Sequence, residues 1–160
     1  MKSLAAFEAI VRATKNVGPP LAGEAQGSVH SFDERNIHPD IAKVSLKLFD
    51  NGHYSQATFE AFKYLDLHVQ KLSGINESGF KLMMAAFADA NPKIKLTDLL
   101  TASDIDEQNG FKFIFAGVMS AIRNPRGHDI TTDPIHRCLD HLSLASVLLR
   151  RIEERKAPAV

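Results

Sequence analysis

The chain has 160 residues, 44% of them hydrophobic, which is enough for one domain with an ordinary core. Its 19 Lys and Arg residues balance its 19 Asp and Glu residues. Net charge therefore predicts no general attraction to nucleic acid, and any such binding needs a local basic cleft. The single cysteine, Cys138, excludes an internal disulfide, and no apolar run approaches the ~20 residues of a membrane span. We expect a cytoplasmic protein with no membrane partner.

The first 36 residues are predicted to lie outside the main domain. Apolar residues at three- and four-residue spacing predict a helix over 1–15. Residues 16–36 are rich in Gly and Pro and poor in large apolar residues, which is typical of a linker or mobile arm. The main domain is expected over 37–156.

From residue 37 onward the apolar pattern is helical. It predicts helices over 38–49, 54–72 and 78–89, closed by Asn51-Gly52, Ser73-Gly74 and Asn91-Pro92. A Ser/Asp followed by Asp/Glu three residues later, starting at Ser103 or Asp104, predicts the next helix. Its expected core residues are Phe111, Ile114, Phe115, Val118 and Ile122.

The last helix is expected to open with Asp133 as its cap and Pro134 as its first helical residue. No run of the sequence shows the alternating pattern of a strand. The predicted fold class is all-α.

The long apolar run FKFIFAGVMS ends abruptly in AIRNPRGHD, residues 121–129. Pro125 disfavours the α conformation at Asn124, so we expect the helix to end or kink there. Arg123 and His128 would face about 140° apart on an unbroken helix, and a break can bring them to one side. A guanidinium can hold phosphate oxygens and an imidazole can transfer protons, while Asn124 could orient either group.

A simpler interpretation of the same residues is structural. Arg123 would cap helix carbonyls, and His128 would only form hydrogen bonds in a loop. Arg-x4-His is a loose pattern, and spacing alone favours this interpretation.

Arg-Asn followed by His, at the end of the penultimate helix of a small all-α domain, resembles the HEPN superfamily of helical bundles. The similarity is closer still to one bacterial family, often labelled Ymh-like. Its pattern is echoed by IHPDIAKVSLKLFDNGHYSQATFEAFKYLD, by SGFKLMMAAF and by GFKFIFAGVMSAIRNPRGHD. The resemblance covers residues 37–151 and implies a bundle of four to five packed helices.

The resemblance implies a metal-independent endoribonuclease that needs no cofactor and belongs to a toxin or antiphage defence module. The enzyme would be a homodimer in which two motifs face each other across one cleft. The ribose 2′-hydroxyl would attack the adjacent phosphate, with His128 transferring protons, Arg123 stabilising the transition state and Asn124 accompanying them. RNA would be the substrate, and an antitoxin or another defence protein would be a further partner.

Other basic residues could widen such a cleft. Two copies of Arg126 would double the local charge, and Lys112 and Arg137 could extend it, although both are ordinary surface residues by default. Two alternatives stay open: a non-catalytic nucleotide- or RNA-binding or dimerisation module, and a purely structural helical adaptor.

Two acidic residues also have alternative interpretations. Glu60 could pair with Arg123 or, equally, with Lys63 on its own helix. His136 and Asp140 lie one turn apart and could in principle hold a metal, but with no third ligand they are more simply a solvated pair. No metal site is predicted.

Overall fold

The computed structural model describes residues 29–129 and 131–155. The helix predicted for 1–15 and most of the predicted linker lie outside these residues. Every regular element in the described part is a helix, which confirms the all-α fold class. The elements are α2 (Ser31–Glu34), α3 (Pro39–Asp50), α4 (Tyr54–Ser73), α5 (Gly79–Ala86), α6 (Ala102–Val118), η1 (Met119–Arg123), α7 (Asn124–His128) and α8 (Ile135–Glu153).

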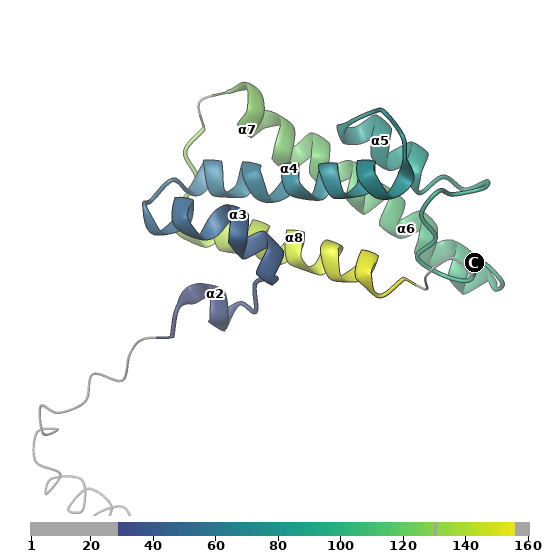
Figure 1. Cartoon of the computed structure of the whole chain (residues 1–160), viewed down its shortest axis with the longest axis horizontal. Helices are drawn as coiled ribbons and strands as arrows, with labels where there is room; N and C mark the ends of the chain where they lie inside the picture. Colours follow the sequence, from purple (N-terminus) through teal and green to yellow (C-terminus); the bar gives the residue numbers. More distant parts are fainter. Residues whose placement is uncertain (1–28, 130, 156–160) are drawn as a thin grey trace, which may run out of the picture.

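The helices pack around α4. Figure 1 shows α3, α4 and α8 with similarly oriented axes, α3 running opposite to α4, while α6, η1 and α7 form one long oblique rod that crosses α4. The short helix α5 packs against both α4 and α6. Within the described residues, no helix combines the length and apolarity needed to cross a membrane.

The central position of α4 follows from its sequence, which carries apolar residues on more than one face. Its fully buried side chains include two small residues that let neighbouring helices approach closely and three large ones that fill the core: Ala57, Ala61, Phe62, Leu65 and Val69. Burying a large apolar side chain contributes about 1.5–3 kcal/mol, so this one helix contributes a large part of the core.

The predicted helix ends on either side of α4 are confirmed. Asn51 is the C-cap of α3, and Gly52 follows with φ +79°. Gly74 is the C-cap of α4, with φ +67°. Both glycines adopt the left-handed conformation, which costs them no side-chain clash.

Other boundaries differ from the prediction. The range 16–36 overlaps α2, and Phe32 of α2 is only 5% exposed, so the packed body begins before residue 37. Helix α6 begins at Ala102 and is capped by Thr101, whose hydroxyl forms a reciprocal capping box with the Asp104 carboxylate. Ile114, expected in the core, is 45% exposed.

Candidate catalytic site

The helix that carries the AIRNPRGHD segment does not break at Pro125. Asn124 has helical angles (φ −63°, ψ −45°), and α7 continues to His128. The predicted break is therefore wrong. The reason lies in η1, a π-helical turn in which the Asn124 N–H donates to the Met119 carbonyl, five residues back. This shift of register starts a new α-turn with Pro125 in its first positions, where a missing N–H is tolerated.

The continuous helix keeps Arg123 and His128 about 140° apart, because each residue rotates by about 100°. Asn124 connects their two faces. Arg123 Nη1 donates to Asn124 Oδ1 at 3.1 Å, and Asn124 lies one turn before His128 on the same face. His128 itself is exposed.

Arg123 is a partly buried cation with no carboxylate partner among the described residues. Its guanidinium carbon lies 5.5 Å from the centre of the Phe59 ring, and its Nε is buried without a hydrogen-bond partner in that part of the chain. A cation over an aromatic face is attracted by the ring. Phe59 and Asn124 therefore position the guanidinium while leaving most of its donors unpaired.

Arg126, three residues further on, has the opposite environment. Its Nε and Nη2 donate to the two carboxylate oxygens of Asp133 at 2.6 and 2.7 Å, and Nη1 donates to the Ile122 carbonyl at 2.7 Å. The side chains of the pair are only 8% and 2% exposed. Burial alone would raise the pKa of Asp133, but the hydrogen bonds and charge of Arg126 outweigh it and lower that pKa.

Asp133 thus ties the start of α8 to the end of α7. The sequence-based interpretation of Asp133 as a helix cap is not what the structure shows, because the N-cap of α8 is Pro134. The exposed Arg137 also approaches Asp133, at 3.7 Å, and lies beside this pair.

Lys112, the third predicted substrate-binding residue, lies elsewhere. It is on α6, eleven residues before Arg123, which corresponds to about 16 Å along a helix. Its side chain is 5% exposed and is paired with Asp89, and its Nζ lies 4.6 Å from the centre of the Phe113 ring. Arg123, Asn124, Arg126 and His128 therefore share the end of one helix, Arg137 lies beside Arg126 through Asp133, and Lys112 lies apart.

Phe59 was not among the predicted site residues, yet it supports this whole helix end. A Cβ added to Gly127 would lie 2.9 Å from Cε2 of Phe59, so α7 packs on α4 at a distance that only glycine allows without movement. Gly127 therefore serves the close packing of α7 on α4. The available signal was the second apolar face of α4, on which Phe59 lies.

The structure also shows the ion-pair partners of Glu60 and Asp140. Glu60 accepts from Lys63 at 3.3 and 3.4 Å, and Arg123 is held instead by Phe59 and Asn124. Asp140 Oδ1 accepts a hydrogen bond of 2.8 Å from Nη1 of Arg35, the C-cap of α2.

One cluster in the described residues has a composition that could suit a metal: His38, Asp40 and Glu153. However, Nδ1 of His38 accepts the Asp40 backbone N–H at 3.1 Å, so neutral His38 carries its proton on Nε2, which lies 2.9 Å from Glu153. A nitrogen that carries a proton cannot ligate a metal. This cluster is a hydrogen-bonded connection between α3 and α8.

Together these features define a small all-α protein in which one long helix ends with an exposed imidazole and a guanidinium that has no carboxylate partner among the described residues. A family model described as "Protein of unknown function (Hypoth_ymh)" matches residues 35–152, and the chain belongs to this family. Comparison with curated proteins and with solved structures gives no match.

Proposed function

We propose that this protein is a HEPN-type, metal-independent endoribonuclease that acts as a homodimer in a toxin or antiphage defence module. One observation carries the proposal. Arg123 is held by Phe59 and Asn124 without a carboxylate partner in the described residues, and an exposed His128 follows one turn after Asn124. Family membership is compatible with this activity but does not specify it.

The reaction follows from these two groups. His128 takes the proton from the ribose 2′-hydroxyl, whose oxygen attacks the adjacent phosphorus. Arg123 stabilises the negative charge that develops on the phosphate oxygens. The P–O5′ bond breaks, a 2′,3′-cyclic phosphate forms, and the leaving oxygen takes a proton from water or from a second imidazole. DNA is no substrate, because it lacks the internal nucleophile.

Dimer formation supplies what a single chain lacks. The Cα positions of Arg123 and His128 differ by about 140° around the helix axis, and we expect one phosphate to contact Arg123 of one chain and His128 of the other. A second chain facing the first provides the missing group. Two copies of Arg123 also give a locally basic cleft on a molecule whose total charge is zero.

The rod that ends in Arg123 and His128 also carries an apolar surface suited to pairing of two chains. The outer face of α6 carries no exposed charge from residue 110 to residue 121, and its members follow helical spacing. They are Gly110, Phe113, Ile114, Gly117 and Ala121. Phe113 is 59% exposed and Ile114 45% exposed. Since α6, η1 and α7 form one rod, two chains paired on this face also bring their α7 helices to the same interface (Figure 1).

The test is incubation of purified protein with defined RNA, with and without EDTA. We expect cleavage that EDTA does not stop and that leaves cyclic phosphate ends. Arg123→Ala and His128→Ala should each reduce the rate by about 10²–10⁴-fold, because each removes one catalytic contribution. His136→Ala, at an exposed histidine of α8, is the matched control and should cleave normally.

Two results would contradict the proposal. Loss of cleavage in EDTA would mean that the reaction uses a metal. RNA that binds to the wild-type protein but is never cut would favour the alternative, a non-catalytic nucleotide- or RNA-binding module.

A further inference from the structure

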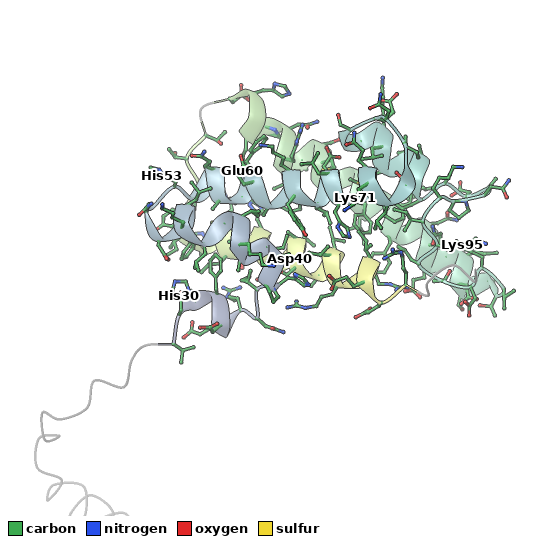
Figure 2. The ribbon with its side chains drawn as sticks, in the orientation of Figure 1. His30, Asp40, His53, Glu60, Lys71 and Lys95 are labelled. Atoms are coloured by element: carbon green, nitrogen blue, oxygen red, sulfur yellow. The ribbon has the colours of Figure 1, made fainter. Side chains whose placement is uncertain are left out.

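A cavity with a volume of about 480 Å³ opens between the first turns of α4 and the segment from α7 to α8. Figure 2 shows its α4 side, with His53 at the start of the helix and Glu60 further along it. The other wall includes Gly127, Asp129 and Thr131. Neither Arg123 nor His128 lines this cavity, so it is separate from the proposed catalytic groups.

The cavity nevertheless adjoins the catalytic site through Phe59. This ring lines the cavity, lies 5.5 Å from the Arg123 guanidinium carbon and touches the position of a Gly127 Cβ. A nucleotide whose base enters the cavity can therefore place its phosphate near Arg123. The volume is within the range of about 300–1,000 Å³ typical of small-ligand sites.

The charges of the lining exclude a phosphate from the cavity itself. Arg126 is neutralised by Asp133, to which it donates two hydrogen bonds. The remaining charged groups of the lining are the carboxylates of Glu60 and Asp129. Such a wall repels an anion and favours an uncharged group that offers N–H donors.

Glu60 is the acceptor best placed for such donors. Its side chain is 30% exposed and its contacts with Lys63 are long, at 3.3 and 3.4 Å. Ion pairs of this kind contribute little, so the carboxylate can accept other donors at small cost. Gln56, also in the lining, adds an amide that both donates and accepts.

We propose that this cavity binds the nucleobase beside the scissile phosphate and that Glu60 makes it prefer guanine. The Watson–Crick edge of guanine presents two adjacent N–H donors, N1–H and the N2 amino group, to the two oxygens of one carboxylate. Adenine and cytosine offer one amino group there, and uracil offers one imino group. The inference rests on the proposed ribonuclease activity, whose substrate it specifies.

In the experiment, wild type, Glu60→Gln and Lys63→Gln each cleave a randomised RNA pool. The products that end in a cyclic phosphate are then sequenced to identify the bases beside each cut. We expect wild type to favour guanine at one position flanking the cut by about tenfold, the scale of a good bidentate contact. Glu60→Gln should lose this preference. Lys63→Gln removes the same ion pair but keeps the carboxylate, so it should retain the preference.

A binding measurement separates the base site from catalysis. Titration with guanosine, which has no phosphate to cut, should show binding to wild type that is about tenfold weaker in Glu60→Gln. Cleavage without a guanine preference, or an unchanged preference in Glu60→Gln, overturns this inference alone. If wild type cuts no RNA, the proposed function fails, and guanosine binding then decides whether the cavity is still a guanine site.

Discussion

Arg123 and Arg126 lie on the same helix end, yet only Arg123 can serve a ligand directly. Arg126 donates hydrogen bonds to Asp133 and to a backbone carbonyl, and its pair with Asp133 is almost fully buried. Within the described part of the chain, the Arg123 side chain donates one hydrogen bond, to Asn124, and contacts an aromatic ring. The difference between the two cations is set by one carboxylate, which makes Asp133 the residue to test.

Asp133→Asn should reduce the free energy of unfolding by about 3–5 kcal/mol, because it leaves the buried guanidinium of Arg126 without its counter-charge. Urea unfolding followed by circular dichroism measures this. Arg137→Ala is the control: Arg137 is 57% exposed and 3.7 Å from the same carboxylate, so its loss should cost less than about 1 kcal/mol. Equal losses in both variants would show that Asp133 is not anchored by Arg126.

Stability should also fall as the pH is lowered from 7 to 5. Burial lowers the pKa of His141, and the charge of Arg126 lowers it further. The folded state therefore binds the proton less readily than the unfolded chain, in which a histidine titrates near 6.5. The stability that neutral His141 contributes is complete above the pKa of the unfolded chain. It is lost as the pH falls through the lower pKa of the folded state.

His141→Gln should make the dependence of unfolding free energy on pH shallower over this range. Urea midpoints at pH 7.5, 6 and 5 provide the measurement. Burial also lowers the pKa of His68, so some slope should remain in the variant. Identical slopes in wild type and variant would contradict the assignment to His141.

At the scale of elements, the sequence predicted the helices well where the signals are local. The helix ends at Asn51-Gly52 and at Gly74 depend only on neighbouring residues, and the structure confirms them. The predicted start of the next helix, at Ser103 or Asp104, was wrong, because the N-cap of α6 is Thr101. The choice of Thr101 is stabilised by Asp104, which also accepts the Leu100 N–H.

The continuous helix through Pro125 could not be predicted in the same way. The continuous helix depends on the hydrogen-bond register of the preceding π-turn and on the packing of Phe59 against Gly127. Phe59 is distant from Gly127 in the sequence, and no local pattern indicates the π-turn. The motif itself could be recognised in the sequence because its residues are adjacent. The different environments of Arg123 and Arg126 could not be predicted, because they depend on contacts outside the motif. A carboxylate seven residues away decided them.

Gly127→Ala tests the contact between α7 and α4. Alanine stabilises a helix by about 1 kcal/mol relative to glycine, and Gly110→Ala, with nothing within 4 Å of the new Cβ, should show this gain. At Gly127 the gain should be smaller, because the Phe59 ring must move away from a Cβ at 2.9 Å. Thermal unfolding measures both changes.

The same variant has a double-mutant control. In a Phe59→Ala background the obstacle is absent, so Gly127→Ala should recover the full gain. RNA cleavage should also fall in Gly127→Ala, since the displaced ring carries Arg123. A full stability gain at Gly127 with Phe59 in place would show that the two helices are not in the close contact described here.

At the scale of the whole molecule, the proposed composite site requires two chains to pair, and we expect them to pair through the uncharged face of α6. Ile114→Glu places a charge in the middle of that face, where Ile114 is 45% exposed and its replacement costs the monomer little packing. We expect the variant to be folded but monomeric by light scattering, and to have lost cleavage although Arg123 and His128 are intact. Lys43→Glu, on the exposed surface of α3, is the control and should remain dimeric. An active monomer would contradict the composite site.

The angle of about 140° between Arg123 and His128 makes a final prediction about which chain supplies each group. If one phosphate contacts Arg123 of one subunit and His128 of the other, Arg123→Ala and His128→Ala homodimers are both inactive. A mixed dimer then contains one complete pair, with the arginine from the His128→Ala chain and the histidine from the Arg123→Ala chain. Random exchange of equal amounts yields about half mixed dimers, each with one of two sites intact, so activity should recover to about a quarter of wild type. If both groups came from the same chain, no mixed dimer would contain a complete pair and mixing would restore nothing. The recovered rate after subunit exchange therefore reports directly on whether the helix geometry of α7 assigns the two catalytic groups to different chains.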